Sequence, residues 1–232
     1  MSKKIQFYPL NEKVSNCVPS PEPSSKHIPR WFRDAEPYMG NKKSFDPNQI
    51  QSTFKKCGPV LDTFLNGYIQ ELWCDINVTQ GETGAILTWG VNPNPVENRN
   101  PEQMINWAVP AGCDPTPFIW GAAWGIKTPK GYSTLVTHPL NRDDLPFRTL
   151  SGLVDSDNFF LPGNVPFYLK QGFEGVIPAG TPLYQIIPVK RESWVKENLE
   201  FNAAQHEKNV FNLRKTIYDS YKKTHWVKKE FK

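Results

Sequence analysis

Prolines run through this chain from residue 9 to residue 188, and their spacing leaves little room for long regular helices. The chain has 22 of them in 232 residues, together with 15 glycines and eight tryptophans. Because proline lacks a backbone N–H and blocks a helix interior, this pattern favours extended, turn-rich structure over a helical bundle. A chain of this length buries roughly 70% of its unfolded surface, so it can hold a full core without disulfides or metals.

Short apolar stretches separated by Gly, Pro and Asn follow one another through residues 57–191, which we expect to form the body of the protein. Six of them read as strands: AILTWGV, PFIWGAAW, GYSTLVTH, RTLSGLVD, VPFYLK and PLYQIIPV. One short helix is expected in GPVLDTFLNGY, where Pro59 suits a first turn and Gly67 suits a stop. Six or more short strands without helical patterns between them predict a mainly β body, a barrel or a sandwich.

Residues 1–56 are predicted to form an extended, Pro-rich N-terminal arm. Prolines at positions 19, 21, 23, 29 and 37 exclude regular helix there and favour an extended path. Apolar residues such as Val18, Ile28 and Trp31 interrupt the arm, so we expect it to lie on a surface. The sequence leaves open whether that surface belongs to the same chain or to a neighbouring subunit.

The C-terminal part, residues 192–232, contains neither proline nor glycine. Apolar residues recur there at three- and four-residue steps from Leu199 to Tyr221, which predicts one long amphipathic helix over residues 192–227, with Ser193 as its N-cap. Such a stripe either docks on the chain's own body or pairs with another subunit.

The positive charge of the protein also lies at this end. The net charge is +4, and from Lys190 onward there are eleven Lys and Arg against six Asp and Glu. The rest of the chain, residues 1–189, sums to −1, which argues against a nucleic-acid-binding body, and nucleic acid is not an expected partner.

Cysteine spacing and hydropathy indicate the expected setting. The four cysteines, at positions 17, 57, 74 and 113, are irregularly spaced with no histidine nearby, which predicts reduced thiols and neither a disulfide framework nor a zinc site. No apolar run approaches signal-peptide or membrane-span length. We therefore expect a cytoplasmic protein with no membrane partner and no metal site.

The stretch with the most chemistry is SGLVDSDNFF, residues 151–160. Asp155 and Asp157 stand on alternate positions behind an apolar pair, so an extended backbone would place both carboxylates on one side. A turn accounts for the same residues equally well, because Asp, Ser and Asn are also common turn residues.

Read in order, the motifs PKGY, SGLVDSD and IPAGTPLYQII resemble the trimeric deoxyuridine triphosphatase and deoxycytidine triphosphate deaminase superfamily. That superfamily carries a P-x-G-Y turn, an R-S-G phosphate motif, G-V-I-D-x-D-Y and then G-D-R-I-A-Q-L. The resemblance covers residues 125–190. It implies the superfamily's fold, the β-clip, and a nucleotide pocket that is completed between subunits.

The same resemblance implies roles for individual residues. Asp155 falls where the superfamily's carboxylate contacts the deoxyribose and orients the attacking water as a general base. Gln185 falls on the strand that closes the pocket. The candidate ligand-binding residues are Tyr132, His138, Arg142, Asp155, Asp157, Asn158 and Gln185. No cofactor is implied unless the chain hydrolyses a nucleotide, in which case Mg²⁺ is required.

Two departures from the superfamily argue against hydrolysis. His138, Pro139 and Leu140 stand where the superfamily has Arg-Ser-Gly, so the phosphate cradle is lost. Asn158 replaces the tyrosine that stacks on the sugar.

Nearly the whole chain also resembles a family of tailed-phage proteins, notably from phages of marine bacteria and cyanobacteria. The stretch KKCGPVLDTFLNGYIQELWCDI and the motifs above carry this resemblance. Together the two resemblances imply a phage-encoded, non-enzymatic homo-oligomer, a trimer, that serves in virion structure or assembly or as an accessory protein. It would reside in the host bacterial cytoplasm or in the virion, beside other virion proteins. The alternative is a deoxyuridine-triphosphatase-like protein that binds or hydrolyses a nucleotide through Asp155.

Overall fold

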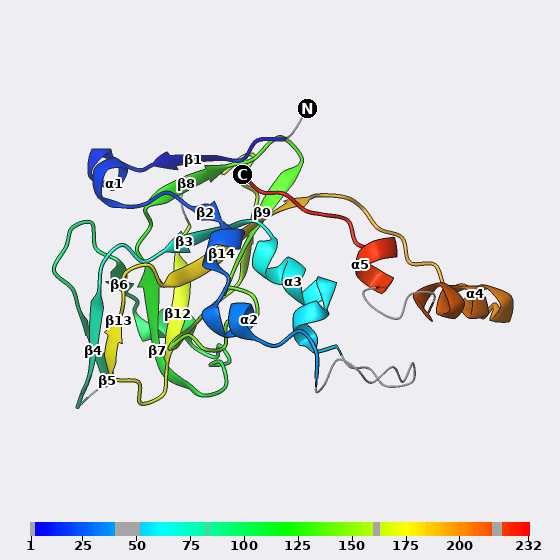
Figure 1. The fold of residues 1–232 in the computed structure, drawn as a ribbon. Helices are drawn as coiled ribbons and strands as arrows, with labels where there is room; N and C mark the ends of the chain where they lie inside the picture. The colour runs from blue at the N-terminus through cyan, green and yellow to red at the C-terminus, as the bar shows by residue number, and fades with distance from the viewer. Residues whose placement is uncertain (1–2, 40–51, 83, 160–162, 215–219) are drawn as a thin grey trace.

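The computed structural model describes residues 3–39, 52–82, 84–159, 163–214 and 220–232. The strands of these residues form four antiparallel sheets, and none of the four closes into a barrel (Figure 1). The protein is therefore mainly β, as the sequence predicts. Of the two predicted forms, a barrel or a sandwich, the described residues form no barrel; they form separate sheets that share one core.

Three sheets and a two-stranded ribbon make up the β structure. The largest sheet has the order β11 (Gly152–Val154), β9 (Tyr132–Thr137), β14 (Pro182–Lys190), β3 (Tyr68–Glu71) and β2 (Glu22–Pro23). The second has the order β10 (Phe147–Thr149), β12 (Val165–Lys170), β7 (Cys113–Trp120) and β6 (Val96–Asn98). The third has the order β13 (Gly175–Ile177), β4 (Ile76–Gly81) and β5 (Gly84–Thr88). The ribbon pairs β1 (Gln6–Pro9) with β8 (Trp124–Lys127).

The core lies where the three sheets meet. The first six residues of β14 are all buried, whereas strands with one exposed face bury alternate residues. On β4, for example, Ile76 and Val78 are buried while their neighbours are exposed. Aromatic rings fill the centre: Trp120 stacks on Phe167 with ring centroids 3.6 Å apart, and Phe147 meets Trp120 edge-on at 4.8 Å. Large rings bury much apolar area each, so these contacts contribute strongly to the stability of the body.

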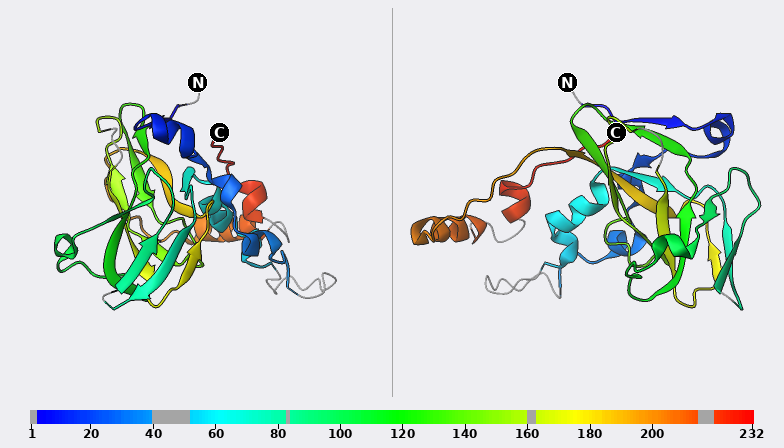
Figure 2. Two further views of the ribbon diagram at one scale, coloured as in Figure 1. Left: turned by 90° about the vertical axis from the view of Figure 1, so that its left-hand side faces the viewer. Right: turned by 180° about the vertical axis from the view of Figure 1, so that it is seen from behind.

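The N-terminal region packs on the body of its own chain (Figure 2). β1 pairs along its length with β8, and β2 pairs with β3. Between and after them lie α1 (Glu12–Cys17), the 3₁₀-helix η1 (Ser24–His27) and α2 (Arg30–Asp34). Val14, Val18 and Phe32 are buried, so the region is held by apolar contacts as well as by strand pairing.

The prediction of a wholly extended arm is therefore corrected. Prolines do not prevent the short helices; Pro29 stands immediately before α2, at the N-cap position. A proline at a helix start loses no hydrogen bond, because the first N–H groups of a helix have no partner within it. The twelve residues from 40 to 51 lie outside the described part of the chain.

The predicted short helix in the body is confirmed as α3 (Gly58–Leu65), with Pro59 in its first turn. Gly67 follows its end with φ +73°, a left-handed conformation that favours glycine. A Cβ at this position would also lie 2.1 Å from the carbonyl oxygen of Ile186. Gly67 is thus required both by the turn and by the close approach of β14.

The prediction of one helix over residues 192–227 is wrong. Residues 192–202 have no regular structure, and helix follows in α4 (Ala203–Arg214) and α5 (Ser220–Thr224). Ser193 caps nothing, whereas the Asn202 side chain accepts a hydrogen bond from the backbone N–H of Gln205 at 3.0 Å, as an N-cap does. Among the described residues, no helix is both long and apolar enough to cross a membrane.

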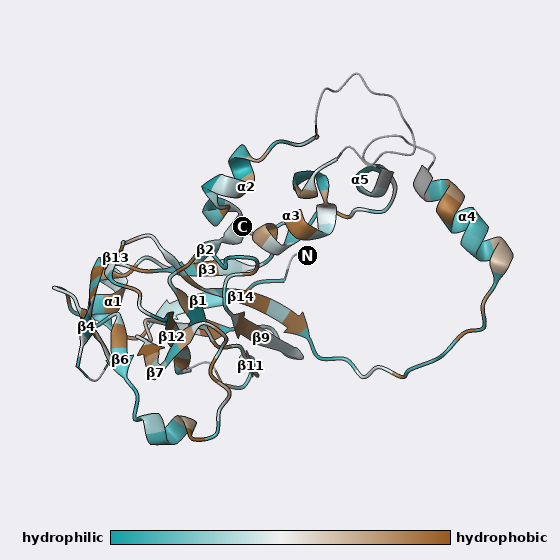
Figure 3. Ribbon diagram, turned by 90° about the horizontal axis from the view of Figure 1, so that it is seen from below, coloured by the Kyte–Doolittle hydropathy of each residue, from teal (hydrophilic) through white to brown (hydrophobic). Residues whose placement is uncertain are grey.

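We call residues 192–214 the C-terminal excursion. It runs clear of the sheets and carries α4 away from the body (Figures 1 and 3). The chain then returns to the body: the indole N–H of Trp226 donates to Asp62 on α3 at 2.9 Å, and the Phe231 ring meets Tyr68 at 5.8 Å. The chain is therefore attached to the body again beyond the excursion, through Trp226 and Phe231.

Candidate functional site

Asp155 and Asp157 lie in the turn that directly follows β11. Ser156, between them, is buried and its hydroxyl shares hydrogen bonds with the hydroxyls of Thr128 at 2.8 Å and Thr134 at 2.6 Å. Ser156 faces inward, and the carboxylates on either side of it both bind the same cation, Arg191. Both sequence interpretations hold in part, since the segment is a turn and still brings the two acids together.

Arg191 binds both carboxylates. Its Nη1 donates to Asp155 at 3.1 Å and to Asp157 at 2.9 Å, and its Nη2 forms a second bond to Asp157. The sheet order explains this contact: β9 lies between β11 and β14, and Lys190 pairs with Tyr132 at the end of β14. The next residue, Arg191, reaches across β9 to the turn after β11.

The sequence analysis missed Arg191, and Arg142 is the one arginine among its candidate ligand-binding residues. The strand pattern PLYQIIPV ended just before it. One signal was available. If PLYQIIPV pairs antiparallel with GYSTLVTH, the end of the first strand lies beside the start of the second, so residues just after PLYQIIPV lie near Tyr132.

Two further groups fix the carboxylates. The backbone N–H of Gly131 donates to Asp157 at 2.8 Å, and the hydroxyl of Ser133 donates to Asp155 at 2.6 Å. The backbone N–H of Arg191 in turn donates to the carbonyl of Gly131 at 2.9 Å. The Asp157 side chain is only 3% exposed, whereas that of Asp155 is 61% exposed. Asp157 is thus enclosed, and Asp155 remains accessible.

The hydrogen bonds from Arg191 and Gly131 lower the pKa of Asp157 to about 2. An unfolded Asp titrates near 3.9, so ionised Asp157 stabilises the fold above about pH 4, and this contribution is lost as the pH falls toward 2. We expect acid unfolding of the wild type to steepen in this range. In Asp157→Asn, urea unfolding should show a smaller loss of stability between pH 4 and pH 2. Equal losses in the two proteins would contradict the role of the ion pair.

His138 and Arg142 lie at the opposite end of β9, about 20 Å from Tyr132 by strand length. His138 is buried: its Nε2 bonds the carbonyl of Arg142 at 3.0 Å, and its Nδ1 accepts the backbone N–H of Thr149 at 3.2 Å. The Arg142 guanidinium forms two bonds to Asp144, at 2.8 and 2.9 Å. Both side chains therefore hold loops together and do not reach Asp155.

Gln185 is also buried and fully engaged. Its side-chain oxygen accepts the backbone N–H of Leu140 at 2.9 Å, and its amide nitrogen donates to the carbonyls of Thr63 and Asn66 at 2.9 and 2.5 Å. These bonds join α3 to the loop after β9. The structure thus gives Gln185 a positioning role between two backbone segments.

Tyr132 and Asn158 are the remaining candidates. Tyr132 stands at the start of β9, where its hydroxyl accepts a hydrogen bond from Lys3 and its ring lies 4.3 Å from the same ammonium group. Asn158 is exposed, and its backbone N–H donates to the carbonyl of Asp155 at 3.0 Å. Of the seven predicted residues, the structure brings Tyr132, Asp155, Asp157 and Asn158 to one end of the sheet and His138, Arg142 and Gln185 to the other.

The chemistry available at the acid pair is limited by Arg191. Its positive charge is already matched by two carboxylates, so it is a poor clamp for a phosphate, which must compete with both. Asp155 retains an accessible carboxylate that can accept a proton. What the arrangement does directly is to join the end of β14 to the turn after β11, and so to fix where the C-terminal excursion leaves the sheet.

No protein-family model matches this chain, and a search of curated proteins finds no match to it either.

Proposed function

We propose that this protein is a non-enzymatic, self-assembling β module in which the C-terminal excursion of one copy contacts another copy. One observation carries the proposal. Trp194, Val195, Leu199 and Phe201 are each between 81% and 95% exposed. Four large apolar side chains within eight residues, all in water, form the kind of surface that marks a contact with a partner.

The attachment of the chain on both sides of the excursion supports this argument. Arg191, immediately before the excursion, binds two carboxylates, and Trp226, twelve residues beyond it, donates to Asp62 on α3. The apolar segment between these two attachments remains exposed and does not pack on the core of its own chain. Exposed apolar area is unfavourable in water, so a covering partner is favoured.

The size of the excursion fits an interface. It contains 23 residues, and stable interfaces use roughly 20–30 residues on each side. A second copy is the partner favoured by the trimeric superfamily that residues 125–190 resemble. The β-clip fold, the trimeric state and the phage origin belong to the same proposal and are supported by that resemblance and by the tailed-phage motifs.

A photo-crosslinking amino acid at Leu199 tests the contact. Irradiation of the purified protein should give a covalent product with twice the chain mass of 26.6 kDa. The same amino acid at Val176, an exposed apolar position on β13, is the matched control and should give little product. A Leu199 variant that yields no more product than the Val176 variant would contradict the proposed contact.

A role in the virion has its own test. If the protein is a structural component, mass spectrometry of purified particles should detect it in a fixed ratio to the capsid protein. Its absence from particles would leave an accessory role in the host cytoplasm and would exclude the structural one.

The nucleotide alternative rests on one observation, the accessible carboxylate of Asp155 held by Ser133. A thermal-shift panel of deoxynucleotides, with and without magnesium, tests it. Stabilisation by one nucleotide that is lost in Asp155→Ala would favour this alternative. No stabilisation by any nucleotide would count against it.

A further inference from the structure

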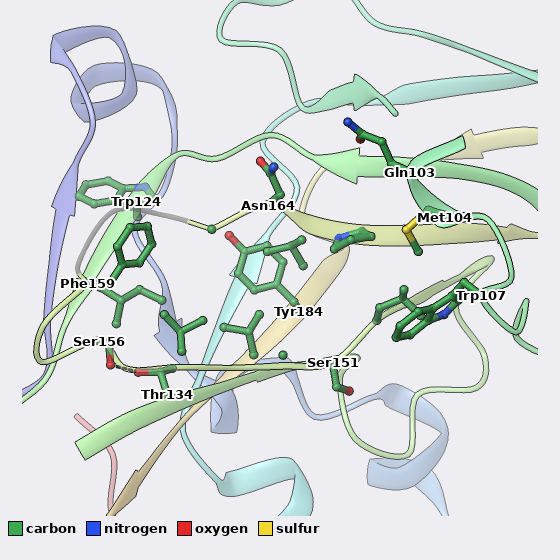
Figure 4. A pocket seen from close by; sticks show the side chains of 18 residues that line it. Gln103, Met104, Trp107, Trp124, Thr134, Ser151, Ser156, Phe159, Asn164 and Tyr184 are labelled. Atoms are coloured by element: carbon green, nitrogen blue, oxygen red, sulfur yellow. Dashed lines mark hydrogen bonds between the residues drawn. The ribbon is translucent and has the colours of Figure 1, made fainter. Parts of the chain in front are cut away.

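A pocket of about 380 Å³ opens beside the largest sheet, on the side where the inward-facing Thr134 and Ser156 line it (Figure 4). Its floor comes from β9 and β11 through Thr134, Val136 and Val154, and the ring of Tyr184 on β14 stands at its centre. Trp107 lies at one end of the pocket. The volume is at the lower end of the range of small-molecule sites.

The Tyr184 hydroxyl is the main reason to assign a ligand to this pocket. The residue is only 7% exposed, and its ring is directed into the pocket. Its hydroxyl makes no hydrogen bond within the part of the chain that the structure describes and stays accessible from the pocket. An accessible hydroxyl without a protein partner is free to donate a hydrogen bond to a ligand or to accept one from it.

A second polar group in the lining is also unpaired within the described residues and, unlike the Tyr184 hydroxyl, is fully buried, which is unfavourable. The indole N–H of Trp124 is buried and has no acceptor among the described residues. By contrast, the hydroxyls of Thr134 and Ser156 at the floor bond each other at 2.6 Å. The pocket therefore combines satisfied groups at its floor with unpaired donors on aromatic residues.

The lining also limits the charge and shape of the ligand. None of the described residues that line the pocket is Asp, Glu, Lys, Arg or His. A charged ligand would lose its hydration without gaining a counter-charge, which is strongly unfavourable. Exposed aromatic rings of Trp107 and Phe159 flank the opening, and aromatic rings pack well against planar rings.

We propose that the Tyr184 pocket binds a small, uncharged molecule that has a planar apolar ring and a polar group able to hydrogen-bond to the Tyr184 hydroxyl. This site is independent of the self-assembly proposed above. It differs in chemistry from a nucleotide site, because a triphosphate would bring several negative charges.

Indole serves as the neutral planar probe and benzoate as its charged counterpart, with binding to the full-length protein measured by calorimetry. Indole should bind saturably, and benzoate should bind far more weakly. Tyr184→Phe removes only the hydroxyl, and the loss of one neutral hydrogen bond should weaken indole binding about 2- to 10-fold. Equal affinity for indole and benzoate, or no binding of either, would overturn the proposal.

Gly152 provides a second variant that fills the site. A Cβ added at Gly152 meets no heavy atom within 4 Å, and its side chain would share the pocket face of β11 with Val154. Gly152→Phe should abolish indole binding without lowering the melting temperature. Leu153→Phe, on the opposite and exposed face of β11, is the matched control and should bind indole normally.

Two results would assign the pocket differently. Retained indole binding in Gly152→Phe would place the probe elsewhere on the protein. Tighter indole binding in Trp194→Ser would indicate that the indole of a neighbouring copy normally fills the pocket. Either result overturns the proposal of a small-molecule ligand.

Discussion

Replacing Trp194, Val195, Leu199 and Phe201 with serine is expected to convert the assembly into single chains of 26.6 kDa. Burial of each side chain contributes about 1.5 kcal/mol or more. If all four are buried between copies, their loss weakens association by about 6 kcal/mol, or about 10⁴-fold in the dissociation constant. The four side chains do not pack in the core of their own chain. The fourfold variant should therefore lose no core packing, and its single chains should not melt at a lower temperature for that reason.

Light scattering coupled to size-exclusion chromatography measures this change. The matched control replaces Lys196 and Glu197 with serine, since both are exposed in the same segment and their exchange leaves the net charge unchanged. The control should keep the wild-type mass. A fourfold variant that also keeps the wild-type mass would show that the excursion is not the contact.

Acidification from pH 7 to pH 4 is expected to destabilise the protein by about 3 kcal/mol through His138 alone. Burial lowers the pKa of His138 to about 4, against an ordinary value near 6.5. The folded state therefore holds His138 neutral while the unfolded chain takes up a proton. The contribution is complete above about pH 6.5 and is lost as the pH falls toward 4.

The hydrogen bonds of His138 explain why its ring stays neutral in the folded protein. His138 accepts a hydrogen bond from the N–H of Thr149 at Nδ1, and a protonated ring would have to give up that bond. Urea unfolding at pH 7 and pH 4 should show the loss in the wild type. His138→Gln should be less stable at pH 7 but should lose about 3 kcal/mol less between the two pH values. The same pH dependence in both proteins would contradict this account.

His27 provides the comparison for this experiment. Burial also lowers the pKa of His27, so some of the pH dependence belongs to it. His27→Asn measures that part separately. Asp157 does not interfere, since its contribution is lost only below about pH 4.

The strands of the body were predictable because their signals are local. The alternation of Ile76 and Val78 with polar residues, or the Pro59 and Gly67 limits of α3, follow from residue types within a few positions. The contact between Arg191 and the acid pair was not predictable in this way. It depends on the pairing of β14 with β9 and of β9 with β11, which brings together residues 34 to 36 positions apart.

The C-terminal error has a different physical cause. A periodic stripe predicts a helix when a surface exists to cover it, because most helix stability in proteins comes from packing. Residues 192–202 meet no such surface on their own chain, and the local cap at Asn202 sets the start of α4 instead. The exposed apolar residues of this segment, for which the predicted helix is absent, are the same residues on which the proposed assembly depends.

The mass of the wild-type protein in solution tests self-assembly most directly. Sedimentation equilibrium over a wide range of concentrations should give a multiple of 26.6 kDa, three times that value for a trimer, with dissociation on dilution. A single species of 26.6 kDa at every concentration would contradict the proposal that the exposed excursion joins copies of this chain.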